Sequence, residues 1–169
     1  NKFFKYLQYR KFFDSKNKFH IKKMICPINS YNPTFKKEII TDLDEILTGV
    51  SNKKNIFLKI DIEGSEYRIL DQIIKYSFCL NALVIEFHDC DLHLQRIETF
   101  IDKFELQLVH LHVNNWSTLN EDNLPGSIEL TFSCKDFNQK NYNKNKIFPI
   151  ELDRPCNKLY KDLPIEFYD

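Results

Sequence analysis

Glycine, net charge and long apolar runs are all scarce in this sequence, and each shortage argues against a class of protein. The three glycines, Gly49, Gly64 and Gly126, stand too far apart to form a glycine-rich nucleotide-binding loop. Basic and acidic residues number 24 each, so the formal net charge is zero, and the chain lacks the basic field that nucleic-acid binding requires. No run approaches the roughly 20 apolar residues of a membrane span.

Cysteine pairs at zinc-binding spacing and a secretion signal are also missing. Three of the five cysteines lie in or beside apolar runs, which predicts buried thiols and a reducing compartment. The first residues mix lysine and arginine with aromatics, unlike a secretory signal. We therefore expect a cytoplasmic protein without a structural zinc site. The cysteines are Cys26, Cys79, Cys90, Cys134 and Cys156.

What is present suits one domain across residues 1–169. Hydrophobic residues make up 43% of the chain and include fifteen phenylalanines, which is enough to bury a core at this length. Residues 1–37 are rich in lysine, as at Lys16, Lys18, Lys22 and Lys23. This enrichment indicates either a solvated basic face or contact with an anionic partner.

The order of apolar patterns predicts the fold class. Helical spacing and buried runs alternate up to residue 103, which is typical of parallel strands joined by helices. Two consecutive strands then follow without a helix between them, which predicts an antiparallel pair. We expect an α/β fold in which a parallel sheet, with helices on both faces, is closed by this C-terminal pair. The predicted helices are 2–13, 41–47, 66–76 and 91–103, the last capped by Asp91; the predicted strands are 19–25, 56–62, 82–87, 106–113 and 127–134; the predicted loops are 29–34 and 138–146.

Polar residues gather where three of these strands end, and ligands bind at the carboxyl ends of strands in such sheets. Carboxylates at the centre of a sheet are costly unless they are paired, hydrogen-bonded or bound to a ligand, so we expect a polar cleft there. Period two puts Asp61 with Glu63, Glu86 with His88, and His110 with His112 on matching faces. The residues are Asp61 and Glu63 on the first strand, Glu86, His88 and Asp89 on the second, and His110, His112, Asn114 and Asn115 on the third.

Each of these residues has alternative interpretations. Asp61 and Glu63 either cap the next helix or bind a ligand, and Glu86 either pairs with Lys59 or belongs to the cleft. His88 is either a general base, a metal ligand or a hydrogen-bonded structural residue. His110 and His112 are either metal ligands or ordinary residues of a polar face, and Gly64 permits close approach or a positive φ. Asp61, Glu86 and His88 together could hold a divalent ion, and we expect Tyr67 and Trp116 in the core or at its rim.

Several segments resemble the FkbM-type methyltransferases, a family of class I Rossmann-like enzymes. KIDIEGSEYRIL (59–70) is similar to the family's KIDVEGAE motif and the V-L that follows it, and TDLDEIL (41–47) to the segment before it. LVIEFHD (83–89) is similar to its next strand. HLHVNNW (110–116), LPGSIELTF (124–132) and LDRPCN (152–157) resemble segments of one branch. The matches run in the same order from residue 41 to the end.

The resemblance implies an S-adenosylmethionine (SAM)-dependent methyltransferase, which acts on a hydroxyl of a sugar or a secondary metabolite. The family motif carries over onto Asp61, Glu63, Gly64 and Glu66, and its next strand onto Glu86 and His88. An acidic residue at the position of Asp61 often faces the methyl acceptor or a metal in class I folds. The resemblance thus implies a transferase of a small-molecule or glycan acceptor.

The beginning of the family's domain has no counterpart here. The family starts with a strand that ends in a D-x-G-x-x-x-G-type loop, followed by a helix and a strand that ends in an acid for the ribose. Residues 2–13 and 19–25 match the second helix and the third strand, so residues 1–40 precede an FkbM-like core at 41–169. The chain also lacks an initiator methionine, and we expect a domain truncated at its N-terminus. No residue is assigned to cofactor binding.

These observations lead to a mechanistic hypothesis. An acceptor oxygen attacks the methyl group in line, with His88 or Asp61 as the base and Glu86 as a further catalytic residue. Glu63, His110, His112 and Asn114 bind the acceptor, and a metal at Asp61, Glu86 and His88 is an alternative way to acidify the hydroxyl. Two other classes stay open: a non-catalytic binding module that retains the half-fold, and a metal-dependent hydrolase.

Overall fold

The computed structural model describes residues 2–13, 20–26, 40–50, 55–134 and 147–166. The chain divides into two compact units, Asn1–Asp42 and Leu43–Asp169, and each is described by itself. The predicted loops at 29–34 and 138–146 lie outside the described residues. One domain across residues 1–169 stays a prediction.

The first unit holds the predicted helix and a short pair of strands. Helix α1 spans Lys2–Phe13, and the basic residues of its last turn suit the negative end of the helix dipole. Strand β1 (Met24–Ile25) pairs in parallel with β2 (Ile40–Thr41). Of the strand predicted over 19–25, the described residues show β1 at Met24–Ile25, and residue 19 lies outside them.

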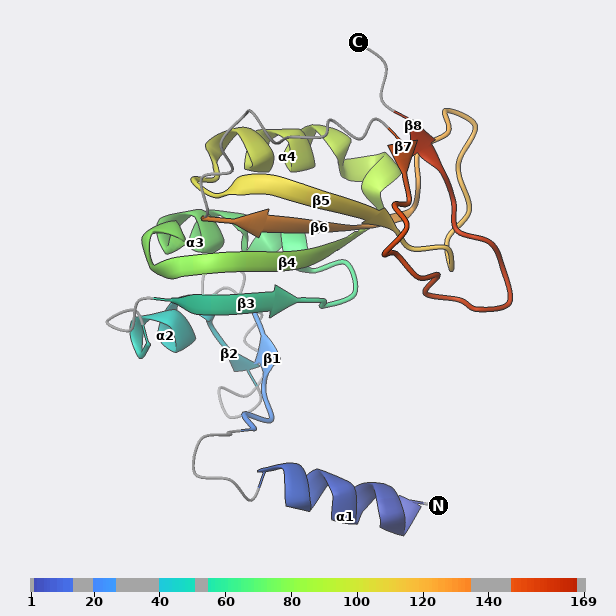
Figure 1. The fold of residues 1–169 in the computed structure, drawn as a ribbon. Coiled ribbons are helices and arrows are strands. Elements are labelled where there is room, and N and C mark those ends of the chain that lie inside the picture. Colours follow the sequence, from blue (N-terminus) through green and yellow to red (C-terminus); the bar gives the residue numbers. More distant parts are fainter. Residues whose placement is uncertain (1, 14–19, 27–39, 51–54, 135–146, 167–169) are drawn as a thin grey trace. The chain divides into compact units, whose positions relative to one another are not determined.

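The second unit contains a four-stranded mixed sheet (Figure 1). Its strands are β3 (Ile56–Ile60), β4 (Leu80–His88), β5 (Gln107–Val113) and β6 (Ser127–Ser133), in the order β3-β4-β6-β5. β3 and β4 are parallel, and β6 runs antiparallel to both of its neighbours. The α/β class and the antiparallel pair are therefore confirmed.

Short helices connect these strands. Helix α2 (Leu43–Thr48) precedes β3, and α4 (Cys90–Lys103) follows β4. The helix predicted over 66–76 is divided: Glu66–Arg68 forms the 3-10 turn η2, Leu70–Lys75 forms α3, and Ser77–Cys79 forms a second 3-10 turn, η3. The prediction that Asp91 caps α4 is wrong, because Asp89 occupies the N-cap position with a left-handed φ of 51°.

One face of the sheet forms the apolar core with α4. Period two turns Leu83, Ile85 and Phe87 of β4 to the same side, and the antiparallel register places Phe132 beside Leu83 and Leu130 beside Ile85. The rings of Phe100 on α4 and of Phe104, which directly follows the helix, make edge-to-face contacts with Phe132. This aromatic cluster holds the helix against the strands.

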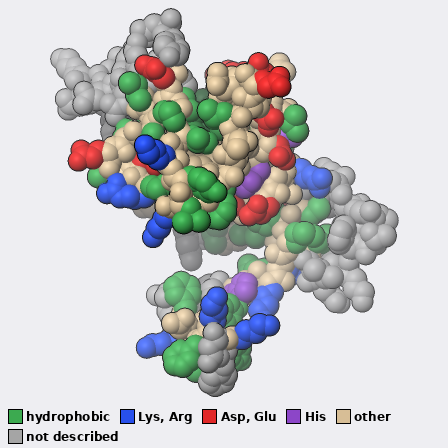
Figure 2. Space-filling model, turned by 90° about the vertical axis from the view of Figure 1, so that its right-hand side faces the viewer, with side chains coloured by type: hydrophobic (Ala, Val, Ile, Leu, Met, Phe, Trp, Pro, Cys, Tyr) green, Lys and Arg blue, Asp and Glu red, His purple; other side chains and the backbone are tan. Residues whose placement is uncertain are grey.

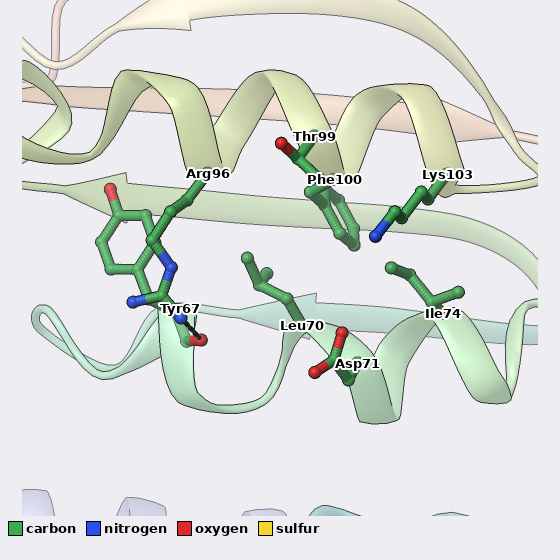
Figure 3. Close-up of a pocket in the computed structure, with 8 residues that line it drawn as sticks. All are labelled: Tyr67, Leu70, Asp71, Ile74, Arg96, Thr99, Phe100 and Lys103. Carbon is green, nitrogen blue, oxygen red and sulfur yellow. Dashed lines mark hydrogen bonds between the residues drawn. The ribbon is translucent and has the colours of Figure 1, made fainter.

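The 3-10 turn η2 joins the same core. The ring of Tyr67 lies 5.5 Å from that of Phe87, between centroids. Arg96 reaches from α4 over the Tyr67 ring and donates a 2.8 Å hydrogen bond to the Tyr67 carbonyl (Figure 3). A small hollow of about 140 Å³ between α3 and α4 lies beside this contact. Tyr67 is buried, as predicted.

The opposite face of the sheet is polar. Glu86 on β4 pairs in register with Glu129 on β6, which in turn pairs with His112 on β5. A segment that follows residue 147 contacts this face and includes the antiparallel pair β7 (Ile147–Phe148) and β8 (Ile165–Glu166). Polar side chains therefore lie on the sheet itself as well as at its edge.

Candidate active site

The carboxyl ends of β3 and β4 bring the predicted cleft residues together. Ile60 pairs with Ile85, so the residues that follow β3 lie beside the last residues of β4. Asp61 and Glu63 are exposed there, while Glu86 and His88 are partly buried. Figure 2 views this edge, towards which β3 points, and shows acidic side chains gathered beside a histidine. These four of the predicted residues therefore lie together at this edge, while the predicted cleft stays a prediction.

A buried carboxylate organises the turn after β3. The side chain of Glu66 has no exposed surface, and it accepts hydrogen bonds from the backbone N–H groups of Ile62 (3.0 Å) and Gly64 (3.0 and 3.3 Å). Glu63 and Gly64 both have positive φ, of 54° and 90°. This left-handed turn suits glycine at position 64, where a side chain would be strained. Glu66 thus fixes the path of the chain between Asp61 and η2.

His88 is held by two neighbours of the motif. Its Nδ1 lies 3.2 Å from Oε1 of Glu66, and its backbone carbonyl accepts a 2.6 Å hydrogen bond from the Tyr67 hydroxyl. A carboxylate can only accept, so Nδ1 carries the proton in this contact. Nε2 lies 3.5 Å from Oε2 of Glu63 and 3.9 Å from Oε1 of Glu86. The ring is therefore oriented with Nε2 towards the acidic side chains of this edge, where it can exchange a proton or bind a metal.

Glu86 is fixed from the side of β5. Asn114 donates a 2.6 Å hydrogen bond from Nδ2 to Oε1 of Glu86, which brings the predicted acceptor-binding residue Asn114 into the cluster. The alternative that Lys59 pairs with Glu86 is wrong, because Lys59 Nζ lies 3.0 Å from Oε2 of Glu129. That hydrogen bond raises the pKa of Lys59, and Glu86 adds a smaller attraction.

A divalent cation would find three ligand groups at this edge. Oxygen atoms of Asp61 and Glu63 and a ring nitrogen of His88 lie within 4.8 Å of one another. Glu63 takes the place that the sequence-based hypothesis gave to Glu86 in this set. A histidine that donates its other nitrogen to a carboxylate is the usual form of a metal-binding histidine, and the contact between His88 and Glu66 provides it. The donor set therefore fits a hard or borderline divalent metal.

His110 and His112 contact the C-terminal segment of the chain. His110 Nε2 lies 2.9 Å from Oδ1 of Asp153, and His112 Nε2 lies 3.4 Å from Oδ1 of Asp162. Their predicted role in acceptor binding stays a prediction, while these contacts show them holding residues 153–162 on the polar face.

Asn115 holds the same segment by four hydrogen bonds. Its Nδ2 donates to the carbonyls of Asn157, Tyr160 and Lys161, and its Oδ1 accepts from the backbone N–H of Asn157 at 2.6 Å. Asn115 and Asn157 are both buried. Residue patterns alone assigned no role to the LDRPCN segment (152–157). In the structure its last residue, Asn157, is anchored to the turn after β5.

Two residues of this site were not predicted as such. Glu66 was noted only as part of a motif, and its segment also contains Arg68, Asp71 and Lys75, so its charge alone did not mark it as buried. Asp153 carried no recognisable signal, because its partner His110 lies 43 residues away in the sequence.

No protein-family model, curated protein or solved structure matches this chain. Among the described helices, none combines the length and the apolar content that crossing a membrane requires.

Proposed function

We infer that this chain carries the acceptor side of a SAM-dependent O-methyltransferase of the FkbM type. The observation that carries the inference is the pairing of His88 Nδ1 with the buried Glu66, which directs Nε2 towards the edge that carries Glu63 and Asp61. A hydroxyl oxygen attacks a methyl group more readily when a base removes its proton. An imidazole held in a fixed orientation by a carboxylate is suited to act as that base.

The order of strands supports this proposal. Parallel β3 and β4 are followed by β6, which runs antiparallel between β4 and β5. In class I methyltransferases the last strand is likewise inserted, reversed, between the two before it. Within the four-stranded sheet, β3 is an edge strand with Phe57 64% exposed, so the sheet has a place where a further strand can pair.

Each residue of the cluster has a separate role in the proposed reaction. His88 Nε2 takes the proton of the acceptor hydroxyl, and Glu66 stabilises the imidazolium that forms. Asp61 lies on the exposed side of the cluster and orients the hydroxyl by accepting a hydrogen bond. Glu86, fixed by Asn114, lies 3.9 Å from Nε2 and places a second carboxylate beside the base.

When bound, SAM would supply an electrophilic methyl group on its sulfonium, with the neutral thioether as the leaving group. The described residues include no glycine-rich loop for it, and the cofactor site is assigned to no residue of this chain. The proposal therefore concerns what the chain does to the acceptor: it binds, orients and deprotonates a hydroxyl. The acceptor classes that the family resemblance implies are sugars and secondary metabolites.

A metal-dependent hydrolase is the second candidate, and the grouping of Asp61, Glu63 and His88 favours it. In that case the cation would sit between these three residues and acidify a water molecule. Mn²⁺ titration separates the two candidates. Hydrolysis of an aryl ester that rises with Mn²⁺ and disappears in Glu63→Gln would favour the hydrolase.

Calorimetry with SAM tests the first candidate. The 169-residue chain is titrated beside a chain extended upstream in its gene, and binding by the extended chain is expected. Transfer of a labelled methyl group from SAM to sugar or polyol acceptors is then measured with His88→Asn as the matched variant. Failure of the extended chain to bind SAM would overturn the proposal.

A further inference from the structure

A hollow lies at the turn after β5, which also carries Asn114, the hydrogen-bond partner of Glu86. It has a volume of about 390 Å³, within the range of ~300–1,000 Å³ that small-molecule sites occupy. Its walls come from the start of α4, the turn after β5 and the start of β6, with Asp91, Trp116, Ser117, Thr118 and Asn120 supplying the side chains that matter here. Polar side chains share its lining with Trp116 and Leu124, so it offers both polar and apolar contacts.

The loop that forms the hollow is held in place from several sides. Ser117 donates from its hydroxyl to the Asn114 carbonyl and accepts from the backbone N–H of Ser127. A Cβ atom on Gly126 would lie 3.0 Å from Cβ of Ser117, so glycine at 126 allows the two chains to approach. The carbonyl of Gly126 also accepts a hydrogen bond from the N–H of Cys90. These contacts therefore fix the shape of the hollow.

Three polar groups of the hollow are left for a ligand. The side-chain oxygen of Asn120 accepts from the N–H groups of Asp122 and Leu124, which leaves its amide nitrogen as a free donor. Within the described part of the chain, the carboxylate of Asp91 and the hydroxyl of Thr118 have no hydrogen-bond partner. The hollow thus offers the Asp91 carboxylate as an acceptor, the Asn120 amide nitrogen as a donor and the Thr118 hydroxyl as either. Its lining residues include no cationic side chain.

Trp116 adds an aromatic platform to these groups. It is 71% exposed, although a tryptophan normally buries most of its area. Its backbone N–H donates a 3.0 Å hydrogen bond to Oδ1 of Asn114, the same residue that fixes Glu86. Asn114 therefore links the platform directly to the proposed catalytic cluster.

We propose that this hollow binds a pyranose ring, with the ring's C–H face on Trp116 and its hydroxyls bonded to Asp91, Thr118 and Asn120. A neutral ring with one apolar face and an equatorial fringe of hydroxyls matches an exposed indole surrounded by free donors and acceptors. The absence of basic side chains from the lining argues against a phosphate or carboxylate ligand. The further step, that this sugar is the methyl acceptor, rests on the proposed function. The binding of the sugar in the hollow is independent of it.

The sequence contains one tryptophan, so its fluorescence reports on this hollow alone. The 169-residue chain is titrated with the methyl glycosides of glucose, mannose and galactose, and at least one is expected to change the emission saturably with a Kd on the order of 1 mM. Sorbitol, which has the hydroxyls without the ring, and cyclohexanol, which has the ring without most hydroxyls, serve as ligand controls. Both are expected to bind at least about tenfold more weakly.

Matched variants locate the site. Asp91→Asn is expected to weaken glycoside binding about fivefold to tenfold, while Asp102→Asn, on the same helix and away from the hollow, leaves it unchanged. Trp116→Ala, followed by saturation-transfer NMR on the sugar protons, is expected to abolish it. A response that does not saturate, equal binding of cyclohexanol, or unchanged affinity in Asp91→Asn would each overturn the inference.

These experiments need no SAM, so their outcome is separate from that of the methyl-transfer assay. Glycoside binding without methyl transfer would support the hollow as a carbohydrate site and contradict its role as the acceptor site. Methyl transfer to a non-carbohydrate hydroxyl, without glycoside binding, would overturn the inference and leave the proposed function standing.

Discussion

The imidazole Nδ1 of His88 lies 3.2 Å from Oε1 of Glu66, a carboxylate without any exposed surface. The two residues belong to different elements, η2 and the last position of β4, and the contact joins the turn after β3 to the neighbouring strand. Because the same carboxylate accepts the N–H groups of Ile62 and Gly64, one side chain shapes the turn and orients the histidine.

Removing the Glu66 carboxylate should destabilise the fold. Glu66→Ala leaves two backbone N–H groups and the His88 ring without their acceptor, and we expect the free energy of unfolding to fall by about 3–5 kcal/mol. Glu66→Gln keeps one acceptor oxygen, so its loss should be about 1–2 kcal/mol. Urea unfolding measures both, and equal stability of Glu66→Ala and the unaltered chain would contradict the anchoring role.

Substitutions at the cluster should separate catalysis from stability. In the methyl-transfer assay, His88→Asn should lower kcat by about 10²–10⁴-fold, because the general base is lost, with a smaller effect on KM. Asp61→Asn should also lower kcat, because the acceptor hydroxyl loses the group that orients it. Asp61 is exposed, so this substitution should change the stability of the fold little. The matched control is Asp102→Asn, an exposed acid at the far end of α4, which should retain activity. Full activity in Asp61→Asn would remove that residue from the mechanism.

Stability should fall in alkaline solution because of a buried thiol. Burial raises the pKa of the Cys90 thiol from 9.0 to about 12. Between these values the unfolded chain loses a proton that the folded chain keeps, so the free energy of unfolding decreases as pH rises, by about 1.4 kcal/mol per pH unit. Burial also raises the pKa of Tyr67 from its ordinary value of 10.0, so the tyrosine adds to this loss only above pH 10.

Cys90→Ala should therefore flatten the dependence between pH 9 and 10. The exposed Cys134 provides the control, because Cys134→Ala should leave the slope unchanged. Urea unfolding at a series of pH values measures the slope. An unaltered slope in Cys90→Ala would show that the thiol does not carry it.

The C-terminal segment should depend on Asn115. Asn115→Ala removes four hydrogen bonds to residues 157–161 and leaves buried backbone groups unsatisfied, and we expect a loss of about 1–3 kcal/mol. Hydrogen exchange of residues 157–161 should become faster, while exchange in β4 changes little. Unchanged exchange in the segment would contradict the anchoring by Asn115. Asn81→Ala, at an exposed position of β4, is a suitable control.

Sequence patterns predicted most of the elements because each pattern is local. The apolar run at 56–62 and the alternation at 127–134 depend on backbone periodicity, which neighbouring residues alone determine. Element ends were less well predicted: the 66–76 helix is divided at Ile69, and Asp89, not Asp91, stands at the N-cap of α4. These ends depend on how η2 and β4 pack, which periodicity does not contain.

By itself the sequence determined that Asp61, Glu63, Glu86 and His88 would meet, because parallel strands bring their carboxyl ends to one edge. Only the tertiary structure decided their partners: Lys59 with Glu129 instead of Glu86, His88 with Glu66, and Asn114 with Glu86. It also decided the exposure of Trp116, which the sequence placed in the core or at its rim and which is 71% exposed. Such pairings join residues up to 70 positions apart, and they follow from strand order and register, which no short stretch of sequence encodes.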